Sequence, residues 1–174
     1  MMKGTLLMDS GRTLRADART VEENGVRTLY QDILERWNRR NAHDFAALFV
    51  GDGNVIGFDG SQMNGQPEIE SVLGQIFIDH VTATFLGIIR EVRFLSADVA
   101  VLRAVVGMSP PGTNDINPAV NAIQTLVATK QQGQWRAALF QNTPAALHGR
   151  PQMRDELTVE LRLALRGSPS RKSM

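Results

Sequence analysis

The side chains on which catalysis and metal binding most often depend are scarce in this sequence. The chain has 174 residues, no cysteine and three histidines. Without cysteine there can be no disulfide, thiolate nucleophile or thiolate metal ligand. The histidines do not occur at metal-ligand spacing, so we expect no metal site. His43 and His80 each adjoin an aspartate, but neighbouring helical residues do not face each other, and helix-end roles are the better interpretation.

Two charged residues in predicted strand regions are candidates for catalysis. Asp59 could act as a general base, with Arg103 polarising a developing oxyanion. The alternative for Asp59 is structural, because an Asp-Gly dipeptide between two short strands is a strong hairpin signal. Arg103 interrupts the stretch "VAVLRAVVG", where strand alternation places it on one face with Val101 and Val105. A buried arginine needs a partner, either a ligand anion, Asp59 or Glu91; otherwise Arg103 lies on the outer face.

Two amides occur on strand faces that are otherwise apolar. They are Gln124 and Asn142. Asn142 shares its strand face with Ala138 and Phe140. A pocket that is mostly apolar, with a few amides to orient its occupant, is typical of small-molecule sites. The alternative is that both amides are satisfied by hydrogen bonds within the core.

Two aromatic residues lie on the apolar stripe of the first predicted helix. Tyr30 and Trp37 are expected to pack in the core, although a buried phenol needs a partner and Tyr30 could offer its hydroxyl to a pocket. The glycines of the chain do not have the G-x-G-x-x-G spacing of a dinucleotide loop. We therefore expect no nicotinamide, flavin or other cofactor.

An α+β arrangement must position these residues. A capping box predicts that the first helix begins at Thr20, and its apolar positions recur as far as Trp37. A short helix, a strand pair around the Asp-Gly turn and a third helix follow. From Ala83 onward come four long β-rich segments, and then a helix from about Met153 to Leu165. Consecutive antiparallel strands with helices on one face predict a curved sheet that can enclose a ligand cavity.

Composition predicts one ordinary globular domain. We expect a flexible arm over residues 1–19, a domain over 20–166 and a disordered tail over 167–174. The net charge is +1 and the basic residues are scattered, so nucleic-acid binding is not expected. No apolar run is long enough for a membrane helix or a signal-peptide core, and a cytoplasmic location is the default expectation.

Several segments resemble a known superfamily. "WNRRNAHDFAALFVGDGNVIGFDGSQMNGQPEI" is similar to the front half of nuclear transport factor 2-like proteins, which include ketosteroid isomerases and SnoaL-like polyketide cyclases. "VRFLSADVAVLRAVVGMSPPG", "NPAVNAIQTLVA" and "LFQNTPAALHGRP" more narrowly resemble the bacterial SgcJ/EcaC group. The resemblance implies a cone: a strongly bent antiparallel sheet wrapped around helices, usually dimeric through its convex face. Here an extra C-terminal helix follows the cone.

The same resemblance counts against the usual chemistry of these enzymes. Ketosteroid isomerases use an aspartate base and an oxyanion hole made of a tyrosine and a protonated aspartate. Aligned by the resemblance, the base position falls on Gly57, the tyrosine position on Ile33 and the second aspartate on Gln124. None of these side chains can replace the group it stands for. The alignment also points the strand face of Arg103 toward the interior.

The leading hypothesis is that the protein binds an apolar small molecule and carries or acts on a polyketide-like secondary metabolite. The residues expected to line the pocket are Tyr30, Trp37, Val101, Val105, Gln124, Ala138, Phe140 and Asn142. One alternative is an acid–base isomerase, cyclase or hydratase that uses Asp59 with Arg103, and another is a non-catalytic dimerisation module. The sequence leaves open whether the protein is an enzyme. The convex face, with Asn121, Ile123, Thr125 and Val127, is the expected homodimer surface.

Overall fold

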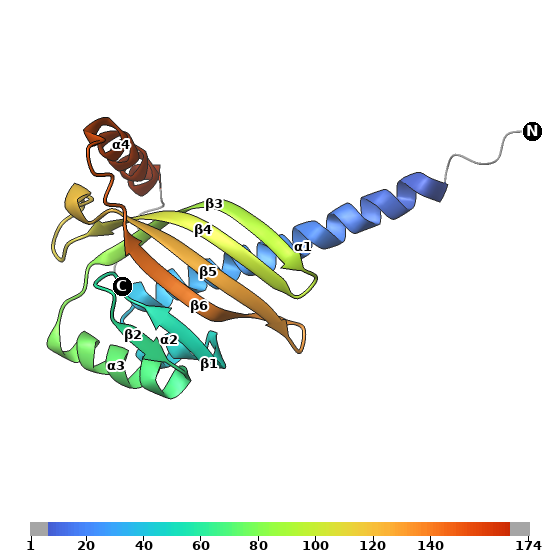
Figure 1. Cartoon of the computed structure of the whole chain (residues 1–174), viewed down its shortest axis with the longest axis horizontal. Helices are drawn as coiled ribbons and strands as arrows, with labels where there is room; N and C mark the ends of the chain where they lie inside the picture. Colours follow the sequence, from blue (N-terminus) through green and yellow to red (C-terminus); the bar gives the residue numbers. More distant parts are fainter. Residues whose placement is uncertain (1–6, 168–174) are drawn as a thin grey trace, which may run out of the picture.

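The computed structural model describes residues 7–167 of the chain, and their side chains from residue 16 onward. Four α-helices, one 3-10 helix and six strands make up this part of the chain (Figure 1). In chain order they are α1 Leu7–Asn38, α2 Ala42–Ala46, β1 Phe49–Ile56, β2 Gln62–Asn64, α3 Gln66–Asp79, β3 Thr84–Ser96, β4 Val99–Ser109, η1 Pro118–Val120, β5 Ala122–Gln131, β6 Gln134–Pro144 and α4 Pro151–Gly167. The expected order of helices and strands is confirmed.

The six strands form one curved sheet in the order β2-β1-β6-β5-β4-β3. The four long strands from β3 to β6 pair antiparallel with their chain neighbours, as short connections require. The first strand joins this sheet by pairing parallel to β6, which the sequence pattern does not indicate. The strand pair β1–β2 is thereby placed at one edge of the sheet, and β3 forms the other.

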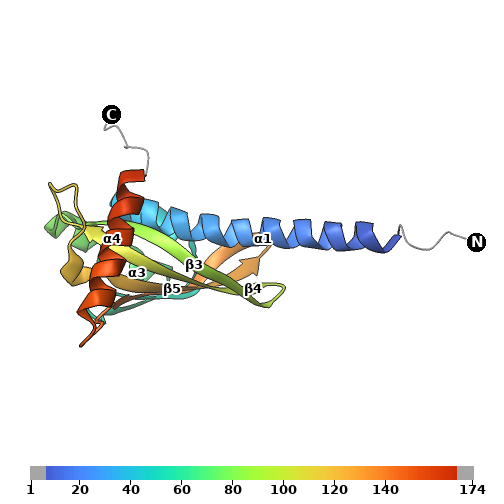
Figure 2. The same ribbon diagram turned by 90° about the horizontal axis from the view of Figure 1, so that it is seen from above.

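The first helix is longer than the sequence predicts. It begins at Leu7 rather than Thr20, so residues 7–19 belong to a helix and not to an arm without regular structure. The predicted capping box at Thr20 is wrong, because the Thr20 hydroxyl donates to the carbonyl oxygen of Ala16, one turn earlier in the same helix (3.0 Å). The N-terminal part of α1 extends past the sheet (Figure 2). Residues 1–6 of the predicted arm and residues 168–174 of the predicted tail lie outside the described residues.

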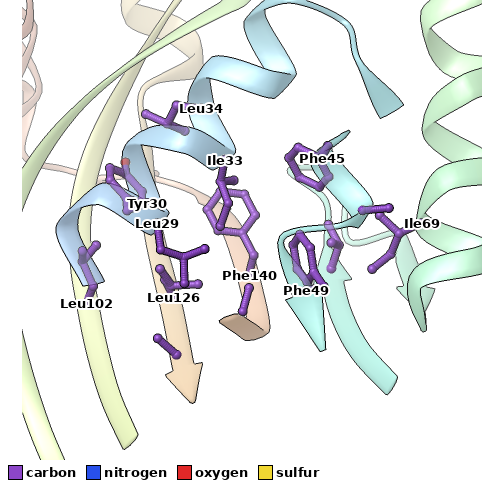
Figure 3. Close-up of a cluster of buried hydrophobic side chains, with 14 of the residues drawn as sticks. Leu29, Tyr30, Ile33, Leu34, Phe45, Phe49, Ile69, Leu102, Leu126 and Phe140 are labelled. Carbon is purple, nitrogen blue, oxygen red and sulfur yellow. The ribbon is translucent and has the colours of Figure 1, made fainter. Parts of the chain in front are cut away.

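The core lies between α1 and the concave face of the sheet (Figure 3). Side chains from α1, β4, β5 and β6 meet there, and α2, β1 and α3 extend the same cluster. The fully buried members include Val26, Tyr30, Ile33, Phe45, Phe49, Ile69, Leu73, Leu102 and Leu126. Burial of this much apolar surface is the main force that holds the helix on the sheet.

The last helix packs on the opposite, convex side, against β3 and β4 near the η1 end. Leu161 of this helix is fully buried. Two bidentate ion pairs flank this contact, Arg90 with Glu160 (2.5 Å) and Arg162 with Asp115 (2.7 and 2.8 Å). No helix within residues 7–167 is long and apolar enough to cross a membrane.

Candidate ligand site

A row of three hydrogen-bonded side chains crosses the concave side of the sheet. The Tyr30 hydroxyl, from the middle of α1, donates to Gln124 Oε1 on β5 (2.7 Å). Gln124 Nε2 in turn donates to Asn142 Oδ1 on β6 (3.4 Å). The last two residues are direct partners in the β5–β6 ladder, so their side chains stand side by side on the same face. We call Tyr30, Gln124 and Asn142 the polar row.

The polar row separates two apolar regions. On β5 the inward positions run from Ala122 through Gln124 to Leu126, and only Leu126 belongs to the main core. Beyond the row, Val106, Met108 and Ala122 form a second, smaller buried cluster. The partly exposed side chains packed against that second cluster are Phe58, Ala83, Phe85 and Val120. We call these seven residues the outer apolar cluster; it adjoins the polar row at Ala122, two residues before Gln124 on β5.

The interior around the polar row is electrically neutral. Among the described residues the buried polar side chains are uncharged: Ser109, Asn121, Gln124, Asn142 and Thr158. Burial raises the pKa of Tyr30 well above its ordinary range, because a phenolate there would lose its hydration. The row therefore offers neutral hydrogen-bonding groups and has no group that exchanges a proton near neutral pH.

Trp37 contacts two members of the outer apolar cluster, Phe85 and Ala83. Its ring stacks on Phe85 with centroids 4.8 Å apart, and its indole Nε1 donates to the carbonyl oxygen of Ala83 (2.9 Å). Asn38 fixes the backbone of the same segment, because its side chain both accepts from Phe85 N (2.7 Å) and donates to Phe85 O (2.9 Å). Trp37 therefore lies at the edge of the outer apolar cluster, and its predicted role in a ligand pocket stays a prediction.

Asp59 lies in an exposed turn and not in the interior. Its carboxylate accepts hydrogen bonds from the Ser61 backbone N–H (3.0 Å) and from the Ser61 hydroxyl (2.7 Å). These bonds lower the pKa of Asp59, chiefly through the Ser61 hydroxyl. A general base at neutral pH needs the opposite shift, toward 7. The structural interpretation of the Asp-Gly dipeptide is the one that the structure supports.

The predicted inward orientation of Arg103, Val101 and Val105 is wrong. The buried residues of β4 are the alternate set: Ala100, Leu102, Ala104 and Val106. Arg103 is exposed on the outer face and pairs with Glu91 on β3 (2.6 Å). Because its partner is a surface carboxylate, the guanidinium is solvated and does not reach the concave side. Asp59 and Arg103 therefore do not share a cavity.

The predicted inward orientation on β6 is correct for Asn142 and wrong for Ala138. Gln124, Phe140 and Asn142 are buried on the concave side, as expected. The β5–β6 register shifts between Val127 and Ala128, so Ala137 takes the position opposite Ala128 and is fully buried. Ala138 is the extra residue of this irregularity and is only partly buried. Simple alternation cannot locate such a shift.

Sequence reasoning missed Phe58, Phe85 and Met108 as parts of a site. Phe85 was inside the predicted β-rich segment, and its position two residues after Ala83 in an apolar strand gave no reason to single it out. Phe58 was part of the turn "GFDG", where an aromatic residue between glycines is the one available signal. Phe58 and Phe85 come from opposite edges of the sheet, so only the closure of the cone brings them to one cluster.

A surface hollow of about 350 Å³ lies elsewhere, between α4 and the loop after β4. Asn114, Asp115, Arg162, Leu165 and Arg166 line it. The hydrogen bonds from Arg162 lower the pKa of Asp115, so the carboxylate stays ionised and paired with Arg162. This hollow is on the α4 side of the protein and is separate from the polar row.

The structure is similar to solved structures of the cone type. A domain of unknown function with a cystatin-like fold from Nostoc punctiforme superposes with a TM-score of 0.69 at 25% identity, covering 79% of this chain and 85% of that one. An NTF-2-like protein of unknown function from Shewanella oneidensis gives 0.58 at 17% identity, covering 70% and 98%. A putative scytalone dehydratase from Novosphingobium aromaticivorans gives 0.61 at 19% identity, covering 75% and 88%. No protein-family model and no curated protein matches the chain.

These likenesses define the fold. The protein has the nuclear transport factor 2-like cone, a curved six-stranded sheet with helices, to which α4 is added at the C-terminus. The expected fold class is confirmed. Because this fold carries many unrelated functions, the function must be argued from the site itself.

Proposed function

We propose that the protein binds an apolar small molecule at the outer apolar cluster, with the polar row orienting it. The observation that carries this proposal is the position of the row. Gln124 and Asn142 interrupt the concave apolar face between the main core and the outer apolar cluster, in which Phe58 and Phe85 are partly exposed. A mostly apolar surface with a few convergent polar groups is what small-molecule sites have in common.

The neutral character of the site favours binding over acid–base catalysis. Proton transfer needs a group whose pKa lies near the working pH, and the polar row consists of a phenol and two amides. The isomerase or hydratase hypothesis also required Asp59 and Arg103 to meet, and both are exposed on separate elements. A non-catalytic binding function does not require Asp59 or Arg103.

The chemical nature of the ligand is suggested by resemblance. The segments similar to the bacterial SgcJ/EcaC group support a polyketide-like secondary metabolite, or an intermediate of one, as the occupant in a bacterial cytoplasm.

Native mass spectrometry of protein purified from its own host tests the proposal. We expect an apolar compound to remain bound to the wild-type protein and to be lost from Phe58→Ser, which removes a side chain of the outer apolar cluster. Leu95→Ser is the matched control, because Leu95 is 58% exposed on β3 and contributes nothing to that cluster. Absence of any extracted compound, together with no binding of apolar probes in solution, would refute the proposal.

We also propose that the convex face forms a homodimer. Ile123 is 45% exposed on this face, and its ladder partner Val105 extends the apolar surface onto β4. Thr125 and Val127 lie on the same face of β5, partly buried. Asn121 does not belong to this surface: it is buried beneath α4, where its Nδ2 donates to the Thr158 hydroxyl (2.8 Å).

The mass of the protein in solution tests the dimer. Light scattering should give twice the chain mass for the wild type and the monomer mass for Ile123→Glu, because a charge at a buried apolar contact is costly. Ile78→Glu is the control, because Ile78 is 79% exposed on α3, outside this face, and the variant should keep the dimer mass. A wild-type monomer at high protein concentration would exclude this surface as a dimer interface.

A further inference from the structure

We propose that the ligand of the outer apolar cluster is uncharged and presents a carbonyl oxygen to the side-chain amide of Asn142. This inference rests on the proposed function of the same site. It comes from the direction in which hydrogen bonds run along the polar row, and from the group that stands at the end of the row.

The phenol at one end fixes the orientation of both amides. Tyr30 has one proton, and it donates that proton to Gln124 Oε1. Gln124 must then turn its Nε2 toward β6, where Asn142 accepts with Oδ1. The donor group of Asn142, its Nδ2, is consequently directed away from the row.

That terminal donor has no partner of its own. Within residues 16–167, Asn142 Nδ2 makes no hydrogen bond, although the residue is only 6% exposed. This nitrogen is not one of the fully buried unpaired side-chain atoms, which among the described residues are Asn121 Oδ1 and Thr129 Oγ1, so it reaches accessible surface. Its neighbour along the concave face is the outer apolar cluster, through Ala122 and Pro144, which face each other in the ladder. A ligand seated on the cluster could therefore satisfy the donor with a carbonyl oxygen.

The same surroundings disfavour a charged ligand. No buried side chain in the described part of the chain carries a charge. A carboxylate beside Asn142 would have no cation to compensate its loss of hydration. Arg103, the one cation predicted to serve such a ligand, is on the outer face with Glu91. The site should thus select a neutral acceptor over both a hydrocarbon and an anion of the same size.

Three bicyclic probes of nearly equal size separate these possibilities: tetralin, 1-tetralone and tetralin-1-carboxylate. Equilibrium dialysis of the full chain should give 1-tetralone about tenfold tighter binding than tetralin, equivalent to about 1.4 kcal/mol, and the carboxylate the weakest binding. Asn142→Leu and Asn142→Asp should each abolish the preference for the ketone while retaining tetralin. Thr143→Val, which changes the adjacent outward-facing residue, should retain it.

The outcomes distinguish this inference from the proposed function. If wild-type protein binds tetralin and 1-tetralone equally, the carbonyl inference is wrong and the apolar site stands. A ketone preference that persists in both Asn142 variants excludes Asn142 as the donor. Tightest binding of the carboxylate overturns the neutral-ligand inference. If none of the three probes binds, the proposed function itself fails.

Discussion

The hydroxyl of Tyr30 and the side-chain oxygen of Gln124 lie 2.7 Å apart and join the middle of α1 to the centre of the sheet. Tyr30 is 1% exposed and Gln124 is fully buried, so water cannot replace either partner. A buried polar pair of this kind specifies one arrangement of helix and sheet, because any slip along the helix would leave both groups unpaired. The same pair is the inner end of the candidate ligand site.

Removing either partner of this pair should destabilise the protein. Tyr30→Phe leaves Gln124 Oε1 buried without a donor, and we expect a loss of about 1–3 kcal/mol in the free energy of unfolding. Gln124→Leu leaves the phenol unpaired and should cost a similar amount. In urea titrations the double variant should lose less than the sum of the two single variants. Strict additivity would show that the hydrogen bond contributes nothing to stability.

The buried phenol should also govern stability in alkali. Burial raises the pKa of Tyr30 above its unfolded value near 10. The native state therefore keeps the phenol proton at pH values where the unfolded chain has lost it. The stability that this provides is complete below about pH 10 and is lost as pH rises from there toward the native pKa.

The chain has one tyrosine, so phenolate absorbance reports Tyr30 alone. We expect phenolate to form together with the loss of helical circular dichroism, and Tyr30→Phe to lose stability less steeply with rising pH above 10 than the wild type. Phenolate formation while the fold is still intact would mean that Tyr30 is accessible to solvent, contrary to the structure.

Close packing beside the row makes a second prediction. Gly87 lies on β3 where a Cβ would stand 2.8 Å from Leu34 Cδ1 and would also contact the Tyr30 hydroxyl. Gly87→Ala should therefore lower the free energy of unfolding by about 1–3 kcal/mol through overpacking. Gly74→Ala is the matched control: this position is inside α3 and a Cβ there meets nothing within 4 Å. It should stabilise by up to about 1 kcal/mol, because alanine favours helix. Thermal unfolding measures both, and equal effects would contradict the packing argument.

The class of fold was predictable because its signals are local and repeated. The helical stripe ending at Trp37, the short connections between long β-rich segments, and the Asp-Gly turn each have a direct physical meaning. The two amides of the site could also be predicted, since a glutamine or asparagine on an apolar strand face must be either bonded in the core or part of a pocket. Gln124 and Asn142 fit the first description, because they are bonded to each other in the interior; their part in a ligand site is the proposal made above.

The errors arose where local pattern does not determine orientation. Both faces of β4 are apolar apart from Arg103, so alternation defined two sets of residues but not which set faces α1. Arg103 was itself the better indicator of the outer face, since an unpaired buried arginine is costly and Glu91 was available across the ladder. The shift that moves Ala138 and the parallel pairing of β1 with β6 depend on long-range contacts. The start of α1 was missed because a capping residue can also occur inside a helix, as Thr20 does.

The docking of α4 should depend on one leucine more than on its ion pairs. Leu161 is fully buried against the convex face, whereas Leu163, two residues later, is 61% exposed. The Arg90–Glu160 and Arg162–Asp115 pairs are substantially exposed, and such pairs contribute little to stability. Leu161→Ala removes apolar contacts and leaves a cavity, which costs about 2–5 kcal/mol in buried sites.

Backbone hydrogen exchange followed by mass spectrometry can resolve this helix from the rest of the domain. In Leu161→Ala we expect the amides of α4 to exchange much faster than in the wild type, while those of β5 and β6 keep their protection. Leu163→Ala should leave the exchange of α4 unchanged. Arg90→Leu should have an effect smaller than that of Leu161→Ala, because it removes only a solvated charge pair. If Arg90→Leu releases the helix and Leu161→Ala does not, charge rather than apolar burial holds α4 on the sheet.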